Sequence, residues 1–221
     1  MFFHWGPYSV PAYLNEWYSR NMYAKRLPQN LYHEKTYGKL LEFGYKDFYN
    51  SLTGEGFDAD AWGDLVVKSG ARYAGVVTEH SDNFSMWDSK ISLVNCVNYG
   101  PRRDITVLTA KAFWERGIKV LTTFHHAWNW GWFMSTDNEA DVYDPTNEKY
   151  YGKALPLETN RYLPYAIPIR LLTTCGRIRY WRFAKNTGRI SYISTAVPLS
   201  SGNPTAMRWP SVITSFARRG F

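Results

Sequence analysis

The sequence YAGVVTEHSDNFSMW, residues 73–87, decides the fold class that we predict for this chain. Its first five residues, Tyr73–Val77, form an apolar run, and the next five, Thr78–Asp82, are mostly polar. A short apolar run with polar boundaries predicts a strand that is buried on both faces, as in a parallel sheet. The polar residues then follow the carboxyl end of the strand, where α/β barrels and open α/β sheets place their functional side chains.

Two helices are predicted around this strand. The first covers residues 59–69, between Asp58 as its N-cap and Gly70 as its C-terminal stop. Its apolar residues follow helical spacing at Ala61, Trp62, Leu65 and Val66. The second helix lies between Asp104 and Gly117, with an apolar face formed by Ile105, Leu108, Ala112 and Phe113.

Further strands are predicted on both sides of these helices. The end of one strand is predicted at Phe2–Gly6, and another strand covers residues 118–124. Strands that alternate with helices through short turns predict a parallel sheet with right-handed crossovers. Polar and aromatic residues follow all three strands, which favours an α/β fold of the TIM-barrel type. We therefore predict the N-terminal portion of a (β/α)8 barrel, incomplete with three strand–helix units.

The segments between these elements are harder to interpret. Residues 8–56 are expected to form a long site-building loop with short helices at residues 15–23 and 45–49. Residues 131–158 are expected to be polar loop, and no element is predicted beyond them. Aromatic residues make up 18% of the chain, and they suit either a core that is rich in rings or platforms for sugars and bases.

Charge divides the 221 residues into two regions. Residues 1–158 contain all 19 acidic residues and 16 of the 26 basic ones, a net charge of −3. Residues 159–221 contain ten basic residues and no acidic one. So abrupt a change predicts two regions: a barrel portion, 1–158, and a basic tail of no recognisable fold, 159–221.

Two explanations of the tail stay open. Its arginines alternate with Tyr180, Trp181 and Phe183, a composition that also occurs in proteins that bind nucleic acid. A slip of the reading frame would explain the loss of acidic residues and of periodicity together. We favour the frame slip or a misassigned end, and we do not expect a nucleic-acid partner.

Other classes of protein find little support. Cys96 and Cys175 show no disulfide framework, and no run of about 18 apolar residues predicts a membrane partner. His125 and His126 have no carboxylate at ligand spacing, so we predict no metal and no other cofactor.

Five blocks of sequence resemble a known family, and they occur in its order at plausible spacing. They are HWG with YSVPA at residues 4–12, EWY at 16–18, FD before Trp62 at 57–58, EHSDNF with Trp87, Ser89 and Lys90, and GPRRD at 100–104. Together they cover residues 1 to about 130 and resemble the α-L-fucosidases of glycoside hydrolase family 29. The end of the chain shows no such block.

The resemblance implies a (β/α) barrel that hydrolyses terminal α-L-fucosides with retention, through a carboxylate nucleophile and a second carboxylic acid. It implies fucose contacts at His4, Glu16 and His80, with a fucosylated glycan as the partner. Trp5, Trp87 and Trp128 are candidate platforms for the apolar face of the sugar on physical grounds. The predicted substrate-binding residues are His4, Trp5, Glu16, His80, Ser81, Trp87, His125 and Trp128.

This sequence departs from the family at several positions. Ser81 replaces a second histidine, Asn83 a glycine and Glu79 a lysine, and His125 follows Thr123 and Phe124 where tyrosines are usual. The family's nucleophile is an aspartate on the next strand, but residues 159–221 contain no aspartate, and the acid/base glutamate follows later still. We therefore expect no catalytic residue in this chain, which would be an inactive fragment or, alternatively, a non-catalytic fucose-binding remnant.

Overall fold

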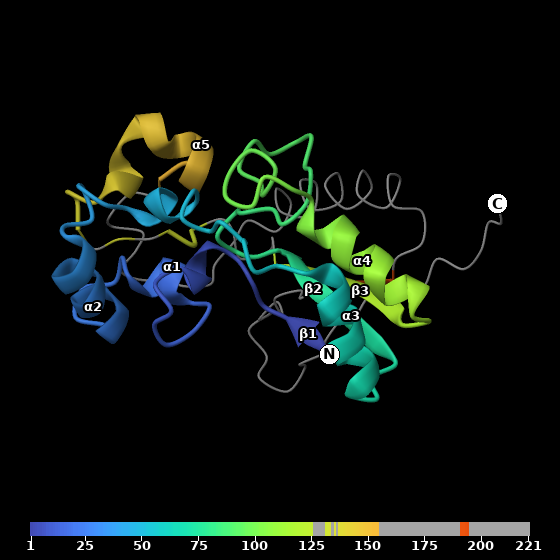
Figure 1. Cartoon of the computed structure of the whole chain (residues 1–221). Coiled ribbons are helices and arrows are strands. Elements are labelled where there is room, and N and C mark those ends of the chain that lie inside the picture. Colours follow the sequence, from blue (N-terminus) through green and yellow to red (C-terminus); the bar gives the residue numbers. More distant parts are fainter. Residues whose placement is uncertain (126–130, 134, 136, 155–190, 195–221) are drawn as a thin grey trace, which may run out of the picture.

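Four strands form one parallel sheet in the order β1-β2-β3-β4 (Figure 1). The structure is a computed structural model that describes residues 1–125, 131–133, 135, 137–154 and 191–194. The strands are β1 (Phe2–Phe3), β2 (Tyr73–Glu79), β3 (Lys119–Phe124) and β4 (Ser191–Ser194). The predicted parallel α/β arrangement is confirmed for these residues.

The two long helices of the sheet begin and end where the sequence indicates. In α3 (Ala59–Lys68), the Asp58 carboxylate accepts hydrogen bonds from the backbone N–H groups of Asp60 and Ala61 at 2.8 and 3.1 Å. In α4 (Ile105–Glu115), Asp104 accepts from the N–H of Val107 at 2.8 Å. Such caps satisfy backbone donors that have no partner inside the helix.

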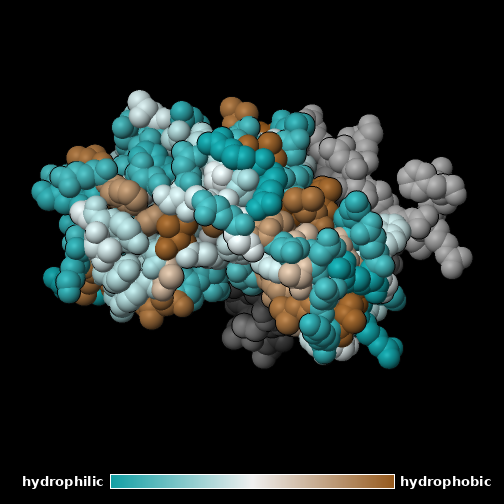
Figure 2. All heavy atoms as spheres, in the orientation of Figure 1, coloured by the Kyte–Doolittle hydropathy of each residue, from teal (hydrophilic) through white to brown (hydrophobic). Residues whose placement is uncertain are grey.

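The buried faces of these helices differ from the predicted ones. Leu65 and Leu108 are 51% and 39% exposed, and Ala61 is exposed as well. Small and polar residues, Gly63 on α3 and Thr109 on α4, are buried in addition to apolar ones. The apolar periodicity correctly placed Val66, Ile105, Ala112 and Phe113 on the buried faces, but it did not indicate Gly63 and Thr109. Other apolar side chains reach the surface over α3 and α4 (Figure 2).

A small core joins these helices to the sheet. The ring of Phe3 on β1 stacks on Trp62 with 4.5 Å between centroids and also lies 6.0 Å from Phe113. Val66, Ala74, Phe113 and Val120 are the buried members of this cluster. Phe2, which we expected in a buried strand, is 46% exposed because β1 is the first strand of the described sheet.

The long segment that precedes α3 is more helical than expected. It contains η1 (Pro7–Ser9), α1 (Tyr18–Asn21), α2 (Pro28–Tyr37) and η2 (Tyr45–Phe48). The sequence analysis did not predict α2, because its buried residues, Gln29, Asn30 and His33, are polar. Pro28 in its first turn and Gly38 at its C-cap are the signals that mark its ends.

Most of the aromatic residues that the structure describes pack in a second, larger core. It is formed by this segment together with the stretch that carries η4 (Asp141–Tyr143), η5 (Pro145–Asn147) and α5 (Glu148–Tyr151). Its buried rings include Tyr18, Tyr23, Tyr45, Phe48, Tyr49, Phe84, Trp132, Phe133 and Tyr151. The aromatic residues in this part of the chain are therefore used largely for packing, and the described part of residues 131–154 is not simply a polar loop.

Strand β4 lies in the region where no element was predicted. Its residues Ser191–Ser194 pair in parallel with Leu121–Phe124 of β3. Four residues are too short a run for periodicity to identify. No helix in the part of the chain that the structure describes is long and apolar enough to cross a membrane.

Candidate functional site

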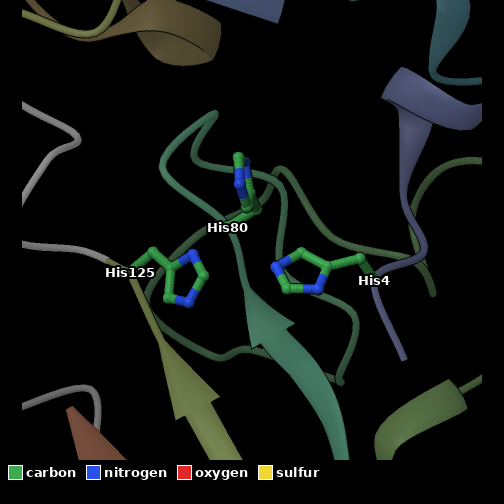
Figure 3. Close-up of side chains that lie close together, drawn as sticks. All are labelled: His4, His80 and His125. Atoms are coloured by element: carbon green, nitrogen blue, oxygen red, sulfur yellow. The ribbon is translucent and has the colours of Figure 1, made fainter. Parts of the chain in front are cut away.

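Three histidines meet at the carboxyl edge of the sheet (Figure 3). His4 follows β1, His80 follows β2 and His125 follows β3. The ring centroids of His4 lie 6.1 Å from His80 and 5.7 Å from His125, and those of His80 and His125 are 5.2 Å apart. Adjacent parallel strands end at the same edge, so residues that are remote in sequence come together there.

An irregularity in β2 helps to set this geometry. Val77 pairs with Thr123 but Glu79 pairs with Phe124, so Thr78 is an extra residue in the ladder. The backbone N–H of His125 then donates to the carbonyl of Glu79 at 2.9 Å. An extra residue re-aims the side chains that follow it, and here the next side chain after Glu79 is His80.

The environment of His80 and His125 favours their neutral forms. His80 is 5% exposed, and burial lowers its pKa well below the usual value, with His125 and His4 adding to the shift. Burial and the proximity of His4 lower the pKa of His125 to about 4. The Nδ1 atom of His80 is buried and makes no hydrogen bond to the described residues.

Two aromatic rings that the sequence analysis did not select enclose His80. Tyr8 lies 5.0 Å from the His80 ring, and Trp132 meets the same ring edge-on at 5.4 Å. Tyr8 is 5% exposed, and burial raises the pKa of its phenol, with the charges of Asp82 and Glu16 contributing. Its place in the Tyr8–Ala12 block was the available signal, but a motif position alone did not distinguish this ring from a core residue.

Glu16 and Ser81 also lie at this edge. The charge of Glu16 acts on both His125 and Tyr8, so its half-buried carboxylate is close to the histidines. Ser81 is 2% exposed, and its hydroxyl donates to the carbonyl of His125 at 3.1 Å. Ser81 thus holds the backbone of His125, and its predicted contact with the sugar stays a prediction.

Asp82 has the structural role that its turn position suggests. Its carboxylate accepts from the Tyr45 hydroxyl at 2.5 Å and from the backbone N–H of Phe84 at 3.1 Å. Burial raises the pKa of Asp82 to about 7. The neighbouring carboxylate of Glu79 is also fully buried and accepts from the Ser85 hydroxyl at 3.0 Å.

The three tryptophans predicted as sugar platforms have different surroundings. Trp5 stacks on Phe57 and lines a hollow with Trp62 that includes none of the three histidines. Trp87 is 3% exposed, so a sugar reaches its ring only if neighbouring residues move. Trp128 lies outside the described residues, and the three platform roles stay predictions.

The histidines also form the one group in the described part of the chain that could hold a metal ion. One possible ligand atom from each of His4, His80 and His125 lies within 4.8 Å of the others. The sequence analysis missed this group because its members are separated by 76 and 45 positions, with no ligand spacing to detect.

Imidazoles gathered at the carboxyl edge of a parallel sheet are typical of an α/β protein that binds a small ligand. Comparison with known proteins identifies the family. A family model described as Alpha-L-fucosidase matches residues 1–181, beyond residue 130, where the resemblance was expected to end. The chain belongs to the α-L-fucosidase family, as the resemblance indicated.

Individual relatives agree with this assignment. The tissue α-L-fucosidase of Bos taurus is 29% identical over 163 residues, which are 66% of this chain and 34% of the relative. An α-L-fucosidase of Dictyostelium discoideum is 30% identical over 70% of this chain and 35% of the relative. This chain thus spans about a third of the length of these relatives.

Solved structures show the same likeness. The α-fucosidase of Thermotoga maritima in complex with fucose has a TM-score of 0.64 and 26% identity, over 84% of this chain and 42% of that one. The same protein in complex with a mechanism-based inhibitor is 36% identical with a TM-score of 0.54, over 57% of this chain and 32% of that one.

Proposed function

We propose that this chain contains the fucose-binding side of an α-L-fucosidase site, on the N-terminal portion of a (β/α)8 barrel. The observation that supports it most directly is the meeting of His4, His80 and His125 at one edge of the sheet (Figure 3). The whole enzymes of the family would hydrolyse terminal α-L-fucosides with retention. This chain by itself would bind the sugar without cleaving it.

The chemistry of the edge suits a small sugar. A neutral imidazole offers one donor and one acceptor, and a carboxylate offers two acceptor oxygens for adjacent hydroxyl groups. His80 is fixed between Tyr8 and Trp132, so a hydrogen bond to a ligand would cost little side-chain entropy. The rings of these two residues also provide apolar surface beside the polar atoms.

The carboxylates near the histidines do not form a catalytic pair. A retaining glycosidase needs two carboxyl groups about 5 Å apart, both able to reach the anomeric centre. Asp82 and Glu79 are fully buried and hydrogen-bonded within the protein. Among the described residues, Glu16 is then the carboxylate at this edge that remains accessible, and one group cannot act as both nucleophile and acid.

Binding and turnover can be measured separately on the purified full chain. We expect saturable binding of L-fucose and none of D-fucose by calorimetry, with no release of product from an aryl α-L-fucoside. Glu16→Gln and His80→Ala should weaken binding by roughly tenfold or more, because each removes a hydrogen bond to the sugar. Glu115→Gln, on the exposed side of α4, is the matched control and should bind as the unmodified chain does.

Two results would count against this proposal. Equal affinity for L- and D-fucose would show that the edge does not recognise the sugar. Release of product that disappears in Glu16→Gln would show that the chain is catalytic after all.

A further inference from the structure

We propose that His4, His80 and His125 form a binding site for a late first-row divalent cation such as Zn²⁺. The sequence analysis predicted no metal, and binding of the cation does not depend on binding of fucose. The site would take the cation through three imidazoles with water as a fourth ligand. Three histidines and a water form a common ligand set for Zn²⁺ in proteins.

The distances are close to those that coordination requires. Three nitrogens about 2.0–2.1 Å from a tetrahedral zinc ion are separated from one another by roughly 3.4 Å. The ligand atoms of the three histidines all lie within 4.8 Å of one another, so coordination needs shifts of about 1 Å. His4 is exposed and His125 is half-buried, so rotation of these two side chains can bring their nitrogens to the ion while His80 stays fixed.

One nitrogen atom of the cluster is buried without a hydrogen-bond partner among the described residues. Nδ1 of His80 makes no hydrogen bond to the described residues although its side chain is almost fully buried. A buried polar atom without a partner costs about 1–3 kcal/mol. Three basic nitrogen atoms that converge on one space (Figure 3) repel one another unless a proton, a hydroxyl group or a cation lies between them.

The surroundings of the cluster suit a bound cation. Glu16 contributes negative charge beside His125, which stabilises positive charge at the cluster. Imidazole ligands select Zn²⁺, Cu²⁺, Ni²⁺ or Co²⁺ rather than Mg²⁺ or Ca²⁺.

The test is a metal titration of the full chain, prepared without an affinity tag and treated with EDTA. Co²⁺ is the probe, because a four-coordinate site gives intense visible absorption, and Zn²⁺ is then added to displace it. We expect one Co²⁺ per chain with a dissociation constant of roughly 10 µM or tighter. Excess Mg²⁺ should leave the absorption unchanged.

Variants identify the ligands. His4 is exposed and His125 is half-buried, so each can be replaced by alanine with less risk to folding than the buried His80. Each replacement should weaken binding by at least roughly tenfold. Glu115→Gln changes an exposed residue of α4 outside the cluster, and it should bind Co²⁺ within twofold of the unmodified chain, about 0.4 kcal/mol.

Three outcomes would overturn the metal site. They are no absorption band at millimolar Co²⁺, unchanged affinity in both His4→Ala and His125→Ala, and a loss in Glu115→Gln as large as in His4→Ala. Fucose is absent from the titration, so these outcomes leave the test of the proposed function separate.

Discussion

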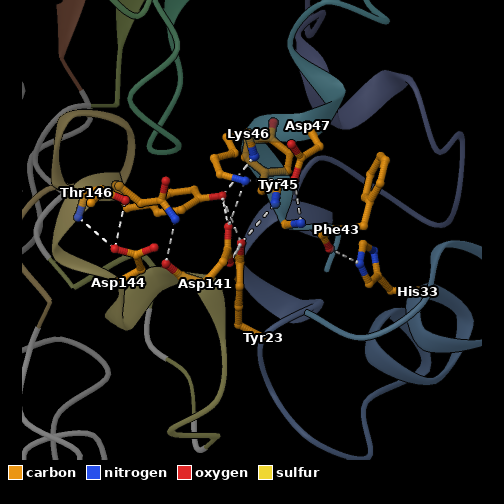
Figure 4. Close-up of polar contacts among 12 residues, drawn as sticks. Tyr23, His33, Phe43, Tyr45, Lys46, Asp47, Asp141, Asp144 and Thr146 are labelled. Atoms are coloured by element: carbon orange, nitrogen blue, oxygen red, sulfur yellow. Dashed lines mark hydrogen bonds and ion pairs between the residues drawn. The ribbon is translucent and has the colours of Figure 1, made fainter. Parts of the chain in front are cut away.

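Replacement of Asp141 by alanine should open the aromatic core, because this carboxylate is the centre of a buried hydrogen-bond network (Figure 4). Asp141 is 2% exposed and accepts from the hydroxyl groups of Tyr23 at 2.8 Å and Tyr151 at 2.5 Å. These hydroxyls in turn accept from the backbone N–H groups of Tyr45 and Lys46, both at 2.9 Å. The network joins two parts of the chain that are about a hundred residues apart.

The expected loss of stability follows from the hydrogen bonds that Asp141 accepts. A hydrogen bond to a charged group contributes about 1.5–3 kcal/mol, so two of them contribute about 3–6 kcal/mol. Burial raises the pKa of Asp141, which means that the folded protein disfavours its charge and part of that gain is offset. Lys46 is 3.8 Å away and contributes little at that distance. We expect Asp141→Ala to lower the free energy of unfolding by about 3 kcal/mol.

The raised pKa also gives a pH dependence. Because the folded pKa of Asp141 lies above the unfolded value of 3.8, its contribution to stability is fully present below pH 3.8 and is lost as pH rises through the folded pKa. Asp141→Asn does not titrate, so this part of the pH dependence should disappear. Its stability at neutral pH should lie between that of the unmodified chain and that of Asp141→Ala.

Hydrogen exchange is the suitable assay, because the amides of Tyr45 and Lys46 report on the network directly. A loss of about 3 kcal/mol should speed their exchange by roughly a hundredfold. Asp144→Ala is the control: Asp144 is exposed and bonds Thr146 in its own turn, so its loss should cost about 1 kcal/mol or less. If Asp141→Ala exchanges no faster at these amides than Asp144→Ala, the network does not hold the core.

Three further predictions concern the edge of the sheet and the end of the chain. A Cβ atom at Gly6 would lie 2.9 Å from the Tyr8 ring, so Gly6→Ala should displace this ring from His80. The affinity for fucose, measured by calorimetry, should fall by up to about tenfold. Unchanged affinity would show that Tyr8 does not contribute to the site. Asn83 has a φ of +66°, so in urea denaturation Asn83→Ala should be about 1 kcal/mol less stable than Asn83→Gly, and equal stability would mean that the backbone is not strained. Resequencing of the gene across codons 150–221 should reveal one inserted or deleted base, and an intact reading frame would contradict the predicted slip.

Local sequence determined the elements whose signals are local. Asp58 and Asp104 were identified as caps because an N-cap bond involves residues two or three positions away. The apolar run before Thr78 marked a strand buried on both faces, and the sequence blocks around it indicated the family that the comparison shows. Asn83, where the family has glycine, lies in the left-handed region that glycine favours.

Tertiary structure alone decided what the strand ends do together. The convergence of His4, His80 and His125 depends on the strand order and on the extra residue at Thr78, and no spacing in the sequence records these. The burial of Gly63 and Thr109 on the helices and the partners of Asp141 were equally invisible, because small or polar residues that are buried by distant contacts look like surface residues in a sequence. The physical reason is that burial and proximity are properties of the whole packed chain, whereas periodicity describes only neighbours along it.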